Sequence, residues 1–467
     1  MACFMVERMS QQSPQPSDMA APSGRAIRIG CGAGFSNDRI EPARDLAERG
    51  ELDFLFFECL AERTLAHSHL ARRRNPSAGY IPMLRKRLEA TLPGCRAART
   101  QIITNAGAAN PAGAAECAAD VARQLGMTGL RIAVVEGDDV LDLLEPATPL
   151  LEGGRLGDHT GEPICANAYL GANVIADALD AEADIVIAGR VADPSLVLGP
   201  LIHAHGWSQS DWERLGAGTL VGHLLECSTQ VTGGYFADPG VKEVSNLAFV
   251  GFPIAEVSPT GAATITKLNG TGGCVTRSTV IEQLFYEMHD PSAYLTPDVS
   301  ADFTRVAITD RGNDRVDVSN AAGRRAPDNY KVTIGFDGGF FAESEIGYAG
   351  HGAANRARYA AEILCERMAV LHGIRDMRID LIGVASQHAT ARPDDCNADG
   401  RDVRMRAALR TSDKDLAEAL LMEMETLWIA GPAGGGGVRG RVLPSIVTRS
   451  ALVPRERVKP RFTMMVS

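Results

Sequence analysis

The chain of 467 residues has neither a long hydrophobic run nor an excess of positive charge. No apolar stretch approaches the about 18 residues that mark a transmembrane helix, so the sequence predicts no membrane span. The formal net charge of −11 at pH 7 argues against binding nucleic acid through a broad basic face. The longest basic run, Arg72 to Arg74, is isolated and is more typical of a solvated helix face or a local anion contact.

Several motifs with known chemistry are also absent. The ten cysteines include no CxxC pair, which excludes a zinc ribbon and a thioredoxin motif. Free thiols in a chain of this size are typical of the cytoplasm. The histidine pairs at 67 and 69 and at 203 and 205 lie in helix-like or loop segments, so we expect no zinc site. Neither GxxxxGK[ST] nor G-x-S-x-G occurs.

The length and the hydrophobic pattern predict two domains after a short leader. Residues 1–25 are rich in Ser, Pro, Gln and Ala and are expected to be disordered. Residues 26–240 alternate short apolar runs with alanine-rich helical segments, which predicts an α/β domain with a mostly parallel sheet. Residues 241–467 predict an α+β domain with a glycine-rich segment near a largely irregular C-terminal end.

Ligands of open parallel sheets bind outside the carboxyl ends of the strands. We predict strands at 27–30, 52–57, 101–104, 131–135 and 183–189, and helices that include 114–127 and 166–180. Each of the five strands is followed by polar residues: Ser36, Asn37 and Asp38; Glu58, Cys59, Glu62 and Arg63; Asn105 with Gly107; Glu136, Asp138 and Asp139; Arg190, Asp193 and Ser195. We expect these side chains to share one functional rim, although the same residue types also dominate plain loops.

The first of these turns, IRIGCGAGFS, is rich in glycine. Its G-x-G-x-G spacing departs from the dinucleotide fingerprint G-x-G-x-x-G, so NAD binding is only weakly indicated. A simpler interpretation is that Gly32 and Gly34 let backbone N–H groups approach a phosphate or carboxylate. A turn without a ligand is the alternative.

The stretch ECLAER has the densest chemistry. If a helix begins here, Glu58 and Glu62 share a face and raise each other's pKa, which suits general acid–base catalysis. An ion-pair network with Arg63 is the alternative. Cys59 is either a thiolate nucleophile at a helix N-terminus or a small buried hydrophobic residue.

A second polar stretch, HLLECSTQVTGG, is expected to be helical up to Gly233 and Gly234. His223, Glu226 and Gln230 then form a polar stripe on an apolar helix. The stripe faces either a cavity or solvent.

Two further groups are candidates for binding charge. Lys267 precedes the loop Asn269–Gly273, in which Thr271 and Gly272 are candidates for contacting an anion beside the lysine. A solvated lysine is the alternative. The carboxylates that follow 131–135 are the only candidates for Mg²⁺, against a solvated acidic turn, and we predict no other cofactor.

Long phrases of the chain occur in the order found in one known family. They include GAGFSNDRIEPARDLAERGELDFLFFECLAERT, TNAGAANP, ADIVIAGRVADPSLVLGPLIH, GTLVGHLLECSTQVTGGYFADPG and LNGTGG. From about residue 28 to 437 the chain resembles the acyclic terpene utilisation, or AtuA-like, family. The family is associated with bacterial breakdown of acyclic terpenes through acyl-CoA intermediates. The resemblance therefore implies an acyl-CoA or carboxylate substrate without specifying the reaction.

The chain departs from the family pattern in two ways. Asn37 replaces a glycine of the usual GFSGDR loop, where it adds a side chain. Longer relatives carry a small C-terminal ferredoxin-like domain, whereas this chain ends soon after its glycine cluster. The resemblance thus suggests a small ferredoxin-like partner subunit, and we also expect a homo-oligomer.

These observations support a catabolic enzyme of hydratase or lyase type as the first hypothesis. Glu58 or Glu62 would be the acid or base, Cys59 is a further catalytic candidate, and Asn105 would stabilise an oxyanion. The substrate-binding candidates are Gly32, Gly34, Ser36, Gly107, Glu136, Asp138, Arg190, Asp193, Ser195, Glu226, Gln230, Gly233, Gly234, Lys267, Thr271 and Gly272. A non-catalytic subunit that binds acyl-CoA or a partner enzyme is the alternative, and an NAD-linked oxidoreductase is a third hypothesis.

Overall fold

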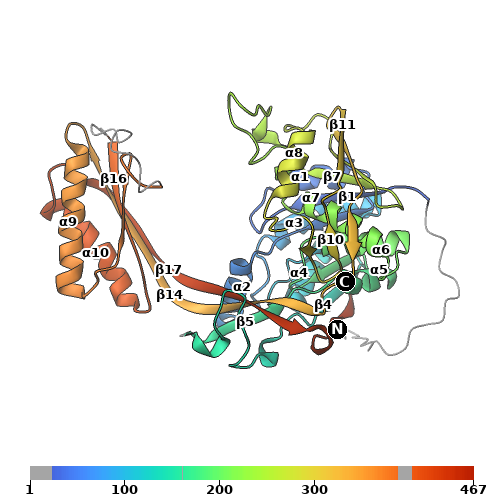
Figure 1. The fold of residues 1–467 in the computed structure, drawn as a ribbon, viewed down its shortest axis with the longest axis horizontal. Coiled ribbons are helices and arrows are strands. Elements are labelled where there is room, and N and C mark those ends of the chain that lie inside the picture. Colours follow the sequence, from blue (N-terminus) through green and yellow to red (C-terminus); the bar gives the residue numbers. More distant parts are fainter. Residues whose placement is uncertain (1–23, 160, 388–401) are drawn as a thin grey trace. The chain divides into compact units, whose positions relative to one another are not determined.

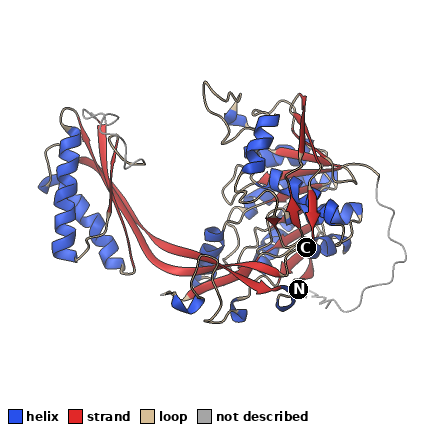
Figure 2. Cartoon of the chain, viewed as in Figure 1, coloured by secondary structure: helices blue, strands red, loops and turns tan. Residues whose placement is uncertain are grey.

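The computed structural model describes residues 24–159, 161–387 and 402–467 (Figure 1). The leader expected at residues 1–25 therefore lies outside the described residues up to residue 23. The chain divides into two units. Unit 1 contains the chain up to Gly335 and from Thr448 onward, and unit 2 is Phe336–Val447. Each unit has a sheet and helices of its own (Figure 2).

Unit 1 is built on a ten-stranded sheet in the order β11-β12-β8-β7-β1-β2-β3-β6-β4-β18. Its strands are β1 (Ile27–Ala33), β2 (Phe54–Phe57), β3 (Gln101–Thr104), β4 (Arg131–Glu136), β6 (Ile185–Ala188), β7 (Pro253–Val257), β8 (Ala263–Lys267), β11 (Ala307–Gly312), β12 (Arg315–Ser319) and β18 (Arg461–Val466). Neighbouring strands from β1 to β4 pair in parallel. All pairings outside this centre are antiparallel. The protein is thus α/β as expected, but the sheet is mixed rather than mostly parallel.

The central strands form because their apolar runs are buried on both faces of the sheet. All four residues of β2, FLFF, are buried. Helices α1 (Glu41–Arg49), α3 (Leu84–Ala98) and α4 (Pro111–Gln124) contribute leucines and alanines to the same core as β1 to β4. The other helices of unit 1 are α2 (Glu62–Arg74), α5 (Asn173–Asp180), α6 (Ser195–His205), α7 (Trp212–Glu226) and α8 (Arg277–Phe285).

Two expected helices of unit 1 begin or end elsewhere. Residues 166–180 were expected to be one helix, but β5 (Pro163–Ala168) occupies the first part, and only α5 is helical. The strand forms because β5 pairs with the distant β14. The helix expected to reach Gly233 ends at Glu226, and a 3-10 turn follows at Ser228–Gln230. The short strands β9 (Tyr294–Leu295), β10 (Ser300–Asp302) and β13 (Ala322–Arg324) form a separate sheet.

Unit 2 has the element order of a ferredoxin-like fold. Strand β14 (Asn329–Ala349) enters the unit and is followed by α9 (Ala353–His372), β15 (Arg378–Ile382), β16 (Asp402–Thr411), α10 (Lys414–Ala430) and β17 (Gly436–Pro454). This is a β-α-β-β-α-β order with the sheet order β15-β16-β14-β17. The topology expected on a separate partner is therefore present within this chain.

The C-terminal region is more regular than its glycine content suggested. The glycine cluster leads directly into β17, and β18 then pairs with β4. The boundary expected near residue 240 falls inside unit 1, because β7 pairs with β1 of the same sheet. Within the described ranges, no helix is long and apolar enough to cross a bilayer.

Candidate functional site

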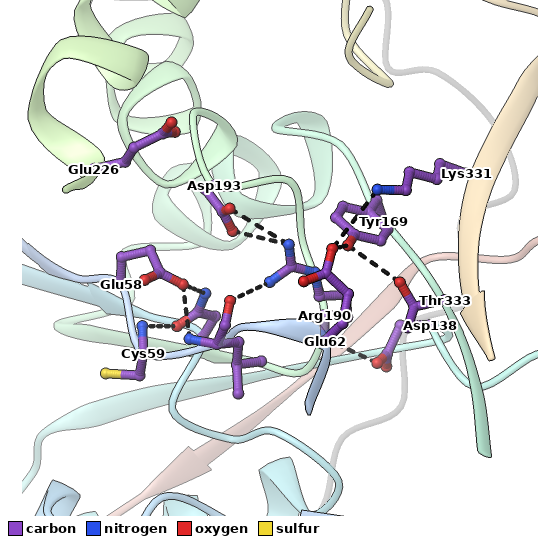
Figure 3. Close-up of polar contacts among 12 residues, drawn as sticks. Glu58, Cys59, Glu62, Asp138, Tyr169, Arg190, Asp193, Glu226, Lys331 and Thr333 are labelled. Atoms are coloured by element: carbon purple, nitrogen blue, oxygen red, sulfur yellow. Dashed lines mark hydrogen bonds and ion pairs between the residues drawn. The ribbon is translucent and has the colours of Figure 1, made fainter. Parts of the chain in front are cut away.

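The residues that follow β2 and β3 bring Glu58 and Asn105 together (Figure 3). Asn105 Nδ2 donates to Glu58 Oε1 at 3.0 Å, and the N–H of Leu60 donates to the same oxygen at 2.7 Å. Asn105 Oδ1 in turn accepts from the N–H of Cys59 at 2.7 Å. The amide thus holds the chain in an extended turn, so the next helix begins only at Glu62. Glu58 and Glu62 therefore do not share a helix face.

Glu58 is a carboxyl group with an unusual environment. Its exposed fraction is only 7%. Burial and the nearby charge of Asp193 raise the pKa of Glu58 well above its ordinary value, although Arg190 and Asn105 oppose this change. A carboxyl group in this state retains its proton at pH values where an exposed glutamate is ionised. It can therefore donate a proton and, after losing it, accept one.

Arg190 follows β6 and is the central cation of the site. Its guanidinium donates to the carbonyl oxygen of Leu60 at 2.7 Å and pairs with Asp193 at 3.1 Å. The guanidinium carbon lies 4.0 Å from the ring centroid of Tyr169, which is a cation–π contact. Three independent contacts thus fix the direction of this buried side chain. They hold its positive charge close to Glu58 and Asp193.

Glu62 is held by Tyr169 and Lys331. The Tyr169 hydroxyl donates to Glu62 at 2.6 Å and also contacts Thr333 Oγ1 at 3.1 Å. Lys331 pairs with Glu62 at 3.6 Å. Burial acts to raise the pKa of Glu62, but the hydrogen bond from Tyr169 and the nearby cations outweigh burial and lower it. Glu62 is therefore a stable carboxylate, which suits binding better than proton donation.

Asp138, two residues after β4, holds the backbone of Arg190. Its Oδ2 accepts from the backbone N–H of Arg190 at 2.8 Å and from Asn167 Nδ2 at 2.9 Å. Burial raises the pKa of Asp138 to about 6. Asn167 Oδ1 contacts His69 Nε2 at 3.0 Å, and all three side chains line a cavity of about 430 Å³.

Cys59 does not have the environment of a thiolate nucleophile. Its exposed fraction is 1%, and it lies three residues before Glu62, the first residue of α2. Burial raises the pKa of its thiol to about 12, although Arg87 opposes this change with a contact of 3.2 Å to the sulfur. A thiol in this state stays protonated and behaves as a packed apolar group. The geometry favours the alternative of a buried structural cysteine.

The glycine-rich turn after β1 is occupied by the chain's own side chains. The N–H of Gly34 donates to Asp38 Oδ2 at 2.9 Å, so Asp38 takes the position expected for a bound anion. Gly32 lies within β1, where a Cβ atom would fall on the ring of Phe57. A Cβ atom at Gly34 would lie 2.7 Å from the backbone of Cys227. These glycines permit close packing, while Ser36 is half-buried beside them.

The polar stripe on α7 is a buried pair rather than a solvated surface. His223 is 1% exposed, and its Nδ1 lies 3.0 Å from Glu226 Oε1. The pKa of Glu226 is raised to about 7, mainly by burial and also by the nearby charges of Asp193 and Glu287. His223 opposes this change. Gln230 lies in the 3-10 turn, apart from this helix. Gly233 and Gly234 lie beyond it, where added Cβ atoms would meet Val244 and Thr229.

Lys267 binds the loop that follows it. Its ammonium pairs with Asp314 at 3.0 Å and donates to the carbonyl oxygen of Thr271 at 3.0 Å. A Cβ atom at Gly272 would lie 1.9 Å from the carbonyl oxygen of Asn246. The side chain is 3% exposed, so it is a buried structural ion pair rather than a solvated lysine. No contact among the described residues joins it to Glu58 or Arg190.

The remaining candidates have structural partners. Ser195 Oγ donates to Asp298 at 2.5 Å, and Glu136 pairs with Arg461 at 3.5 Å. Gly107 packs where a Cβ atom would lie 2.5 Å from the carbonyl oxygen of Ala188. Over the described ranges, no three His, Cys, Asp or Glu side chains are placed to hold a metal ion. The Mg²⁺ alternative at the carboxylates after β4 stays a prediction.

Sequence reasoning missed Tyr169 and the polar pair His69 and Asn167. Tyr169 and Asn167 belong to a stretch that was expected to be helical. If β5 is recognised as a strand, Tyr169 becomes a site candidate, because it directly follows Ala168, the last residue of β5. His69 was considered only as a metal ligand.

Fold and site together define a mixed α/β protein with buried ionisable side chains gathered at one edge of its larger sheet. The model of the acyclic terpene utilisation family protein AtuA matches residues 27–464, so the chain belongs to that family. The family name indicates involvement in acyclic terpene utilisation. None of the curated proteins matches the chain.

Proposed function

We propose that the protein is a catabolic enzyme that acts on an acyl-CoA or a carboxylic acid by hydratase- or lyase-type acid–base chemistry. The observation that carries this proposal is Glu58, a deeply buried carboxyl group whose pKa lies well above its ordinary value. Strongly perturbed carboxyl groups that face other charges are concentrated in catalytic sites. The family's link to acyclic terpene utilisation supports a catabolic substrate.

The roles follow from the contacts. Glu58 transfers the proton, since it is the group whose environment preserves a protonated carboxyl. Asn105 fixes Glu58 through the bond to Oε1, so Asn105 is a positioning residue rather than the oxyanion donor of the sequence hypothesis. Arg190 supplies positive charge beside the reacting groups. Glu62, which is ionised and bonded to Tyr169, orients the tyrosine under the guanidinium.

The experiment is a turnover assay with a panel of acyl-CoA thioesters and their free acids, followed by mass spectrometry for gain or loss of water. We expect turnover by the wild type and a loss of about 10²- to 10⁴-fold in the Glu58→Gln variant, the usual contribution of a general acid or base. Glutamine preserves the acceptor for Asn105 and Leu60, so the melting temperature should not fall. Binding of thioesters without any turnover would contradict the proposal and favour a non-catalytic acyl-CoA-binding subunit.

A further inference from the structure

His223 and Glu226 share a single proton position. His223 Nε2 lies 3.0 Å from the carbonyl oxygen of Leu284, which can only accept, so Nε2 carries a hydrogen. The contact of 3.0 Å between His223 Nδ1 and Glu226 Oε1 then holds one further proton. That proton belongs either to an imidazolium facing a carboxylate or to a carboxylic acid facing a neutral imidazole. The pair therefore titrates as a unit.

The second oxygen of Glu226 is left free for a ligand. Oε2 is buried and has no hydrogen-bond partner among the described residues. A buried polar atom in this state is costly unless something else satisfies it. Glu58 has a similar arrangement, because the hydrogen bonds from Leu60 and Asn105 both end at Oε1. Each carboxyl group thus has one oxygen anchored and the other available.

Glu58, Asp193 and Glu226 lie near one another in unit 1 (Figure 3). The charge of Asp193 raises the pKa of both carboxyl groups, and the charge of each raises the pKa of the Cys227 thiol. The titratable groups that act on Glu226 are His223, Asp193 and Glu287. The ring of Tyr294 is tilted against the imidazole of His223, with centroids 5.0 Å apart, and its hydroxyl lies 3.4 Å from Nδ1. The two carboxyl groups are therefore both within electrostatic reach of Asp193.

Arg190, the cation beside these acids, cannot hold a carboxylate in the usual way. The terminal nitrogens of Arg190 already bond to Leu60 and Asp193, and only Nε lacks a partner among the described residues. A carboxylate is normally bound by two parallel N–H groups of an arginine. One N–H group beside several acids instead suits an uncharged oxygen, such as a carbonyl or a hydroxyl.

We propose that Glu226, held by His223, is a second acid–base group opposite Glu58, and that the two act on a hydroxyacyl thioester or its unsaturated counterpart rather than on a free acid. This inference rests on the proposed function and deepens it. His223 is the positioning residue of the pair, because its ring is fixed by the carbonyl oxygen of Leu284 and packs against the tilted ring of Tyr294.

The step balances without a cofactor. One carboxyl group, as a carboxylate, removes the proton from the carbon next to the thioester, and the electrons of that C–H bond form the carbon–carbon double bond. The C–O bond of the hydroxyl group breaks, and the other carboxyl group donates its proton so that water leaves. Hydration runs through the same steps in reverse. The thioester carbonyl accepts the free N–H of Arg190 as charge develops on its oxygen.

The test compares turnover of 3-hydroxyacyl-CoA and 2-enoyl-CoA thioesters with turnover of the matching free acids. We expect Glu226→Gln and Glu58→Gln each to lose about 10²- to 10⁴-fold, with the thioesters preferred. Glu282→Gln is the matched control, because this exposed glutamate pairs with Lys242 and should leave the rate unchanged. His223→Gln should shift the pH at which the rate changes, an effect that a purely structural role would not produce.

A second measurement does not depend on activity. Imidazole ¹⁵N spectra should show that His223 Nδ1 shares a proton at neutral pH in the wild type and loses it in Glu226→Gln. An unchanged Nδ1 signal in Glu226→Gln would contradict the proton shared between His223 and Glu226. Full activity of Glu226→Gln with an inactive Glu58→Gln would overturn the second acid–base role but leave the proposed function intact. Preference for free acids would overturn the thioester class, and no turnover by the wild type would overturn both proposals.

Discussion

The two units of the chain differ in the surroundings of some of their carboxyl groups. In unit 1, burial raises the pKa of Glu58, Asp138 and Glu226 above the ordinary range of carboxyl groups. In unit 2, arginines lower the pKa of Glu343 and Glu423. Both units contain many carboxyl groups, so the difference lies in where these groups are placed.

The ion pairs of unit 2 follow from its sheet register. Glu343 and Arg406 belong to the neighbouring strands β14 and β16 and pair at 2.5 Å, while Arg441 pairs with the same carboxylate at 2.7 Å. Glu343 is thus neutralised by two arginines, which leaves it a stable carboxylate. Unit 1 instead concentrates acids around one arginine, Arg190. The comparison identifies unit 1 as the part of the chain whose electrostatics resemble an active site.

Replacing Arg190 in unit 1 and Arg406 in unit 2 tests the difference between the units most strongly. Arg190→Gln should reduce the free energy of unfolding by about 3–5 kcal/mol, because it removes a buried charge and leaves Asp193 unpaired. We expect a value near the lower end, since Asp193 remains partly exposed. Arg406→Gln in unit 2 should cost less than about 1 kcal/mol, since its pairs are partly solvated. Denaturant unfolding measures both, and equal losses would contradict the difference between the units.

A second test uses the pH dependence of stability. The pKa of Asp138 is about 6 in the folded protein, against about 3.9 for an exposed aspartate. Because the folded value is raised, its contribution is fully present below about pH 4 and is lost as the pH rises through 6. The loss is about 1.4 kcal/mol per pKa unit, or about 3 kcal/mol. Asp138→Asn should remove this slope. An identical slope in both proteins would show that the pKa of Asp138 is not raised in the folded protein.

The smallest expected effect concerns backbone packing. Gly34→Ala places a methyl group against the backbone of Cys227 and Ser228, so we expect a loss of about 1–3 kcal/mol and some displacement of the adjacent Glu226. Gly436→Ala in unit 2 is the control, because no atom lies within 4 Å of its added Cβ. That variant should change stability by no more than about 0.5 kcal/mol. Thermal unfolding compares the two, and a neutral Gly34→Ala would remove the packing argument.

Much of the framework of unit 1 could be predicted from its sequence. The run at 54–57 is continuously apolar, and the run at 101–104 has two adjacent isoleucines, because strands buried on both faces need no polar alternation. Since parallel strands end at the same sheet edge, Glu58, Asn105 and Arg190 were expected to meet, and the structure brings them together. This expectation needed only local pattern and one rule of topology.

Other features depended on contacts that no local pattern contains. Strand β5 has an alanine-rich sequence that favours a helix, but pairing with β14 makes it a strand. The expected helix at Glu58 is delayed because the side chain accepts the N–H of Leu60. The occupation of the Gly34 turn by Asp38 likewise depends on a side-chain rotamer rather than on glycine spacing.

The protonation of Glu58 at neutral pH tests the account most directly. Infrared difference spectra between the wild type and Glu58→Gln at pH 7 measure it through the carbonyl stretch of a protonated carboxyl group. We predict that the wild type shows this band and that Glu58→Gln lacks it. A carboxylate band in its place would show that Glu58 is ionised, and the acid–base site proposed at the sheet edge would then be contradicted.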